Sequence, residues 1–135
     1  MGAGDLAAFR EAGRTLFSLG LVRGSEGNLS TWDGARLLIT RTGCELARLS
    51  EDDVLEGTLD EPPASASSDL ARHVEIYRGN GPGAVAHAHP PGSVPEGWVP
   101  GQEHGSYAFG ATLEAAVAGI VRSARRAGSR EGAAP

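Results

Sequence analysis

Lysine is absent from this chain of 135 residues, and cysteine occurs once, as Cys44. Without a lysine side chain, none of these residues can form a Schiff base with a carbonyl substrate. A single cysteine cannot form a disulfide within the chain. No apolar run approaches the roughly 20 residues that span a bilayer, and no signal peptide precedes the first predicted helix. We therefore expect a cytoplasmic protein with no membrane partner.

Aromatic residues make up only 5% of the chain, and the formal net charge is −5. Both values argue against a broad nucleic-acid surface, which needs basic residues with aromatics between them. Arg122, Arg125 and Arg126 do cluster, but they fall in the last turns of a predicted helix, where the helix dipole favours cations. We predict no nucleic-acid partner.

Hydrophobic periodicity predicts three helices, over residues 5–19, over 69–78 and from 113 onward. Their expected N-caps are Asp5, then Ser67 or Ser68, and Thr112. A shorter helical turn is expected to follow Ser50.

Short strands are predicted near residues 29–32, 36–40, 84–88 and 107–109. Asp33-Gly34 between the first two is a strong hairpin signal. The remaining segments, 41–48, 57–66 and 90–103, are expected to be loops, and the tail from about Gly128 is expected to be disordered.

Two of the four histidines, His87 and His89, end a predicted strand. Side chains two apart on a strand share one face, so both imidazoles can reach one metal ion. His104 is the candidate for a third ligand, and three imidazoles with an open position form a catalytic metal site. Such an ion can polarise a carbonyl or stabilise an enediolate. The same spacing also fits two strand histidines exposed at a sheet edge and an ordinary loop histidine.

The fourth histidine, His73, lies near the end of a predicted helix. There it is expected to interact with the helix carbonyls, and it is not nominated as a ligand.

Three segments place small polar residues at the ends of predicted elements: Gly27-Asn28, Thr42-Gly43 and Ser67-Ser68. Glycine exposes backbone N–H groups, and serine or threonine adds hydroxyl donors, so each segment can contribute to an anion site. Ser67-Ser68 would also present a helix N-terminus to the anion. Taken singly, each segment is better explained as a turn or a helix cap.

Five short segments, taken in order, resemble the class II aldolase/adducin family. They are G-N-L-S at 27–30, I-T-R-T-G at 39–43, S-S-D at 67–69, H-A-H-P at 87–90 and H-G at 104–105. The resemblance runs from about Leu6 to Ala127. It is interrupted at residues 90–103, between the second and third histidines, where family members are longer.

The resemblance implies a role for each matching residue. His87, His89 and His104 correspond to the ligands of Zn²⁺ or another divalent metal. A second set would hold the substrate phosphate: Asn28, Thr42, Gly43, Ser67 and Ser68. Gly27 would form the turn that brings Asn28 close to it. Asp69 stands where aldolases usually carry a glutamate that acts as acid and base. The epimerase branch of the family has aspartate in a similar context.

The fold implied by the resemblance is an α/β domain of the α+β kind, with a central, mainly antiparallel sheet flanked by helices. It would occupy residues 1–127 as a single domain, with residues 128–135 as a disordered tail. Family members are commonly homotetramers, so we expect a homo-oligomer.

The function implied is that of a metal-dependent lyase, which cleaves a small sugar phosphate such as L-fuculose 1-phosphate by a retro-aldol step. The absence of lysine agrees, because an aldolase without a Schiff base needs a metal. Two alternatives stay open. Asp69 favours a pentose-phosphate 4-epimerase-like enzyme, and the short segment 90–103 favours a non-catalytic domain for binding or assembly, as in adducin.

Overall fold

The structure is a computed structural model that describes residues 1–90 and 106–133. Within these ranges the chain forms α-helices, 3₁₀-helices (η) and strands in the following order: α1 (Ala3–Ser18), β1 (Asn28–Trp32), β2 (Leu37–Thr40), η1 (Leu46–Arg48), η2 (Glu51–Asp53), β3 (Val54–Gly57), α2 (Leu70–Asn80), β4 (Gly83–Ala88), β5 (Ser106–Gly110) and α3 (Leu113–Ala133).

The five strands form one antiparallel sheet in the order β3-β2-β1-β4-β5. β1 lies at the centre and pairs with β2 through the hairpin that Asp33-Gly34 predicts. On its other side β1 pairs with β4, with Asn28 opposite His87. The expectation of a central antiparallel sheet flanked by helices is confirmed.

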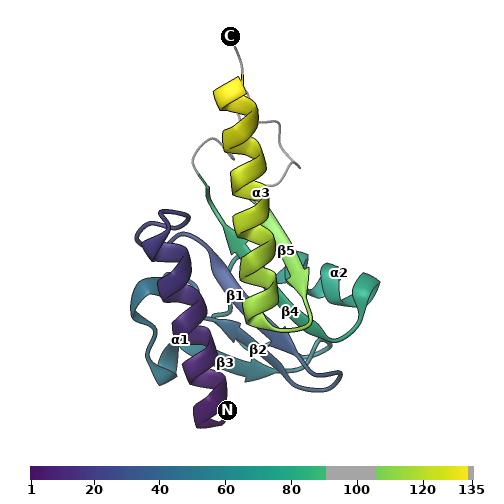
Figure 1. The fold of residues 1–135 in the computed structure, drawn as a ribbon. Coiled ribbons are helices and arrows are strands. Elements are labelled where there is room, and N and C mark those ends of the chain that lie inside the picture. Colours follow the sequence, from purple (N-terminus) through teal and green to yellow (C-terminus); the bar gives the residue numbers. More distant parts are fainter. Residues whose placement is uncertain (91–105, 134–135) are drawn as a thin grey trace.

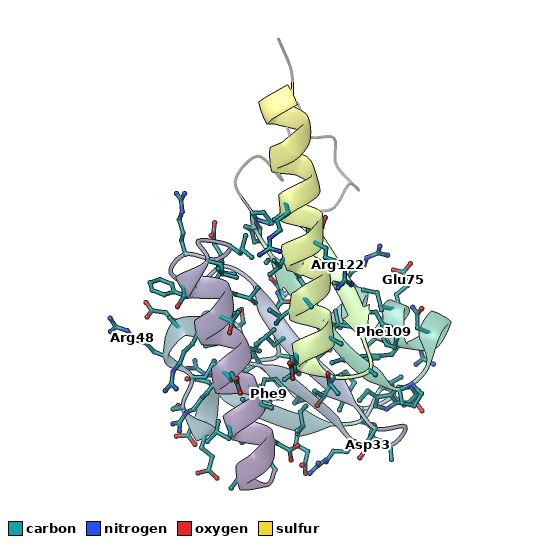
Figure 2. The ribbon with its side chains drawn as sticks, viewed as in Figure 1. Phe9, Asp33, Arg48, Glu75, Phe109 and Arg122 are labelled. Atoms are coloured by element: carbon teal, nitrogen blue, oxygen red, sulfur yellow. The ribbon has the colours of Figure 1, made fainter. Side chains whose placement is uncertain are left out.

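Helices cover both faces of the sheet, with α1 and α3 on one face and α2 on the other (Figure 1). The two cores follow the alternation of side chains along each strand. In β2, Leu38 packs beneath α1 and α3, whereas Leu37 and Ile39 pack on the face of α2. Phe9 on α1 belongs to the first core, and Phe109 on β5 borders the second (Figure 2). Because β2 is buried on both faces, its sequence is apolar without alternation.

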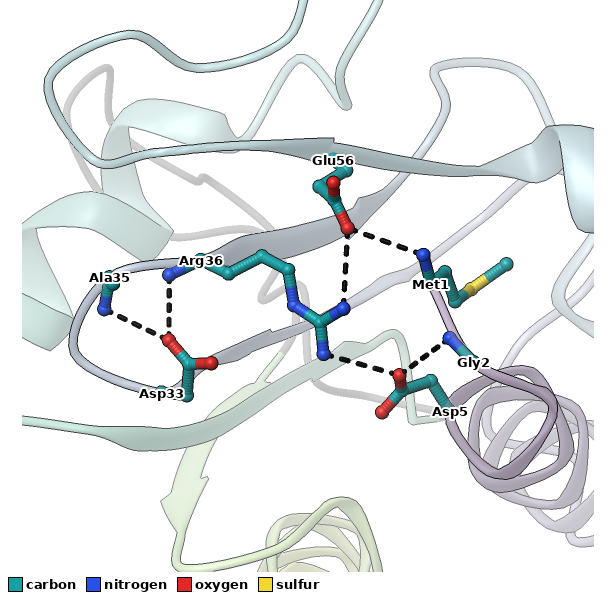
Figure 3. A network of polar contacts seen from close by, with 7 residues as sticks. All are labelled: Met1, Gly2, Asp5, Asp33, Ala35, Arg36 and Glu56. Atoms are coloured by element: carbon teal, nitrogen blue, oxygen red, sulfur yellow. Dashed lines mark hydrogen bonds and ion pairs between the residues drawn. The ribbon is translucent and has the colours of Figure 1, made fainter.

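Arg36 links the first turn of α1 to the hairpin and to the edge strand β3 (Figure 3). Its guanidinium donates to Asp5 Oδ2 at 3.2 Å and to Glu56 Oε1 at 3.3 Å, and the amine of Met1 lies 3.3 Å from the same Glu56 oxygen. The backbone N–H of Arg36 donates to Asp33 Oδ1, which closes the turn. The charged side chains of Arg36, Asp5 and Glu56 are partly exposed to solvent, so each ion pair contributes at most about 1 kcal/mol.

Several element ends differ from the sequence predictions. α1 begins at Ala3, so Asp5 is the third residue of the helix and not its N-cap. The Asp5 carboxylate accepts the N–H of Gly2, which is the N-cap. The N-cap of α2 is Asp69, since Ser67 uses its hydroxyl to accept the N–H of Asp69. Ser50 begins a helical turn as expected, but that turn leads into β3, an edge strand that the sequence does not predict.

α3 continues as a helix to Ala133, past the Gly128 at which the tail is predicted to begin. Residues 128–133 include two glycines, Gly128 and Gly132, and each costs about 1 kcal/mol relative to alanine inside a helix. Among the helices of residues 1–90 and 106–133, none is long and apolar enough to cross a membrane.

Candidate active site

A pocket of about 420 Å³ opens on the α2 side of the sheet, where β1 begins and β4 ends. Nine of the ten residues that the sequence nominates line it: Gly27, Asn28, Thr42, Gly43, Ser67, Ser68, Asp69, His87 and His89. The tenth, His104, lies outside the described residues. Residues from four separate segments of the chain therefore meet in one cavity.

Backbone hydrogen bonds join the segment after β2 to the segment before α2. The N–H of Thr42 donates to Ser65 O at 2.9 Å, and the N–H of Ser67 donates to Thr40 O at 3.1 Å. Arg41 and Ala66 form an isolated β-bridge between these two bonds. The Thr42-Gly43 and Ser67-Ser68 segments are thus held side by side.

Gly27 brings the start of β1 against the end of β4. Its φ is +80°, and a Cβ atom at this position would lie 2.8 Å from the carbonyl oxygen of His87 and 2.8 Å from Val22 Cγ1. Glycine satisfies both the backbone conformation and the close approach. Asn28 follows directly and pairs with His87 in the sheet.

The rings of His87 and His89 lie together, with centroids 4.8 Å apart. His87 is buried, and its Nδ1 lies 3.1 Å from Ser106 O. A carbonyl oxygen only accepts hydrogen bonds, so Nδ1 carries a proton, and in a neutral ring the lone pair would be on Nε2. Nε2 lies 3.7 Å from Asp69 Oδ2.

This arrangement fits two ligands of a metal site. Imidazoles that bind metals almost always donate their other N–H to a carbonyl or a carboxylate, as His87 does. Among residues 1–90 and 106–133, no three His, Cys, Asp or Glu side chains are grouped to hold an ion. A site of three imidazoles would need His104, so metal binding stays a prediction.

The carboxylate of Asp69 lies at the centre of the polar contacts. It accepts a hydrogen bond from Asn28 Nδ2 at 2.7 Å, and its side chain is 38% exposed. A carboxylate that is held by Asn28 and open to the pocket can exchange a proton with a bound molecule.

Tyr107, Arg72 and Arg41 also line the pocket, and the sequence does not nominate them. The Tyr107 ring stacks on His87 with centroids 4.0 Å apart, and the Arg72 guanidinium lies 5.7 Å from the centre of the same ring. Burial and the Asp69 carboxylate raise the pKa of the Tyr107 phenol above its usual value. The position of Arg72, three residues after Asp69 on one helix, is a signal that could have identified it.

The prediction for His73 is wrong. Its side chain does not contact the helix carbonyls but is fully buried, with Nε2 against Asn28 Oδ1 and Nδ1 2.6 Å from Ser30 Oγ. The four-residue spacing from Asp69 directs both side chains to the same face of α2, toward the sheet.

The sequence pattern of the Class II Aldolase and Adducin N-terminal domain matches residues 7–95, and the chain belongs to this family. One relative is the L-fuculose phosphate aldolase of Methanococcus maripaludis, which is 34% identical over 90 residues, covering 63% of this chain and 49% of that protein. Another is the methylthioribulose-1-phosphate dehydratase of a Bradyrhizobium species, which is 37% identical over 82 residues, covering 58% and 38%.

The solved structure of L-fuculose-1-phosphate aldolase from Thermus thermophilus superposes with a TM-score of 0.62 at 43% identity, covering 70% of this chain and 50% of that one. The chain thus spans about half the length of the curated relatives it matches.

Proposed function

We propose that this chain is a metal-dependent lyase, which cleaves a small sugar phosphate such as L-fuculose 1-phosphate by a retro-aldol step. The observation that carries the proposal is the single pocket, in which a histidine pair, one carboxylate and three glycine- or hydroxyl-containing segments meet. Two relatives that differ in reaction, an aldolase and a dehydratase, are both named for sugar phosphates.

The phosphate would lie where the Thr42-Gly43 and Ser67-Ser68 segments run side by side. Ser67 and Ser68 precede α2, so the positive end of that helix dipole lies beside them. Arg41 and Arg72 add two cationic side chains to the pocket lining. The hydroxyl of Ser67 accepts the N–H of Asp69, which leaves its own hydrogen to donate to an anion.

The reacting carbons would lie between Asp69 and the histidines. A divalent ion held by His87, His89 and His104 would polarise the substrate carbonyl. Asp69, which is oriented by Asn28 and lies beside His87, would exchange the proton with the substrate as the carbon–carbon bond breaks. Tyr107 closes one side of this region by stacking on His87.

A second candidate function is the 4-epimerisation of a pentose phosphate, as in the branch of the family that carries aspartate at the position of Asp69. The metal and phosphate residues would serve both reactions. A third candidate is a non-catalytic domain that keeps the pocket for ligand binding or assembly. In each case we expect the protein to act as a homo-oligomer.

The first test is metal content, measured by elemental analysis on metal-supplemented protein prepared without a histidine tag. We expect about one divalent ion per chain in the wild type and none in His87→Ala. Gly4→Ala, a change on the exposed side of α1 with no atom within 4 Å of the new Cβ, is the matched control and should keep the ion.

The second test is turnover of a panel of ketose phosphates with added Zn²⁺. Cleavage of L-fuculose 1-phosphate supports the aldolase, whereas turnover of L-ribulose 5-phosphate alone moves the assignment to the epimerase branch. Bound metal without turnover of any member would leave only the non-catalytic candidate.

A further inference from the structure

A line of buried hydrogen bonds leads from the Asp69 carboxylate into the core beneath α2. Asn28 Nδ2 lies 2.7 Å from Asp69 Oδ2, and Asn28 Oδ1 contacts His73 Nε2. His73 Nδ1 lies 2.6 Å from Ser30 Oγ, which in turn lies 2.7 Å from the Tyr77 hydroxyl. Asn28, Ser30, His73 and Tyr77 are each 3% exposed or less. None of the last three residues lines the pocket.

The direction of every bond in this line follows from the chemistry of its members. Burial and the neighbouring His87 lower the pKa of His73 to about 3, so its ring is neutral, with one donor and one acceptor. Asn28 Oδ1 can only accept, so His73 Nε2 donates to it. His73 Nδ1 then accepts from the Ser30 hydroxyl, and Tyr77 donates to Ser30.

We propose that His73 is a positioning residue, which fixes the side-chain amide of Asn28 so that its N–H points at the carboxylate of Asp69. The terminal torsion of an asparagine side chain is broad and nearly two-fold, so the amide can turn over at little intrinsic cost. In the turned orientation, Asn28 Nδ2 would face the His73 N–H, and Oδ1 would face the Asp69 carboxylate. Both contacts would be repulsive, so His73, at the other end of the amide from Asp69, adds to the preference for the observed orientation.

His73 has a role beyond packing in the core. An apolar side chain of the same size would pack in the core, but it would leave Asn28 Oδ1 buried without a donor. Asp69 and His73 are one helical turn apart, so they can contact the two ends of the Asn28 side-chain amide at the same time. His73 thus acts on Asp69 through Asn28 and touches no substrate.

This inference rests on the proposed function only for its effect on turnover, so its first test does not use turnover. The ¹⁵N shifts of the His73 ring in the full-length wild type report its tautomer. We expect a neutral ring with the proton on Nε2 throughout pH 5–8. A proton on Nδ1, or a charged ring near pH 6, would overturn the proposal without any variant being made.

The second test compares His73→Gln with His73→Leu. Glutamine carries an N–H at the place of Nε2, whereas leucine carries none. We expect the side-chain NH₂ signals of Asn28 to stay near their wild-type positions in His73→Gln and to shift or merge in His73→Leu. Ile39→Val, a small change in the core cluster that also contains Tyr77, is the control for general loosening of the core. Unchanged Asn28 signals in a folded His73→Leu protein would refute the positioning role.

Turnover of the sugar phosphate then measures how the orientation of Asn28 affects catalysis. We expect His73→Leu to lower kcat by about 10- to 100-fold, the usual effect of losing a residue that orients a functional group, with KM changed by less than about threefold. His73→Gln should restore most of kcat. Equal loss in both variants, or a loss confined to KM, would contradict the inference. Absence of turnover in the wild type would remove the proposed function, while the Asn28 signals would still decide the role of His73.

Discussion

Gly27→Ala tests whether the close approach between β1 and β4 holds the site together. Two separate effects should lower the free energy of unfolding of this variant. A side chain at φ +80° is strained by roughly 1–2 kcal/mol. The new Cβ would also lie 2.8 Å from the His87 carbonyl oxygen and 2.8 Å from Val22 Cγ1, and such overpacking costs about 1–3 kcal/mol.

Gly24→Ala separates the two costs. Gly24 lies in the same loop at φ +50°, and a Cβ atom added there would have no other atom within 4 Å, so only the backbone strain applies. We expect the free energy of unfolding to fall by roughly 2–5 kcal/mol in Gly27→Ala and by about 1–2 kcal/mol in Gly24→Ala. Urea unfolding followed by far-UV circular dichroism measures both values.

The same pair of variants also tests the site. Relief of the clash in Gly27→Ala must separate the loop from His87, so that protein should bind divalent metal more weakly than Gly24→Ala. Equal loss of stability in the two variants would refute the argument, because it would show that the contact with His87 contributes nothing.

Three further predictions concern stability and reactivity. In the folded protein the pKa of His73 is lowered to about 3, whereas in the unfolded chain it lies near 6.5. Between these values only the unfolded state binds the proton. The free energy of unfolding should therefore fall as the pH drops below 6.5, with a limiting slope of about 1.4 kcal/mol per pH unit. Urea unfolding at pH 7 and pH 5 checks this, and the corresponding slope should be smaller in His73→Gln. Gly13→Ala should destabilise the protein by more than about 1 kcal/mol, because its Cβ would lie 2.0 Å from Leu46 O, whereas Gly4→Ala should be neutral or stabilising by up to about 1 kcal/mol in the same assay. Cys44 is buried, and burial raises the pKa of its thiol, so a thiol-specific reagent should react with it only on unfolding; rapid reaction of native protein would show that this part of the core opens.

The regular elements were largely predictable because their signals are local. Helical spacing in residues 5–19, the Asp33-Gly34 turn and the Thr112 cap each act within a few residues, and the structure contains the corresponding elements. The edge strand β3 was missed because its four residues carry no alternation, and only pairing with β2 makes them a strand.

The candidate site was predictable as a set of residues but not as a geometry. Glycines, hydroxyl residues and the H-A-H pair stand out by residue type, and nine of the ten nominated positions line one pocket. The helix dipole suggested a different role for His73, since a lone histidine in a helix gives no sign of what lies across from it. Its partners Asn28 and Ser30 are more than 40 residues away in the chain.

The sequence by itself determined which chemistry is available: no Schiff base without lysine, imidazoles two apart on a strand, and polar segments at element ends. These follow from residue identity and local spacing, which do not depend on the rest of the fold. Only the tertiary structure decided that β1 and β4 pair with Asn28 opposite His87, and that α2 packs over them with Asp69 and His73 facing the sheet. The physical reason is that strand register and helix packing are set by burial of apolar surface across the whole domain, and this burial brings together residues far apart in the chain.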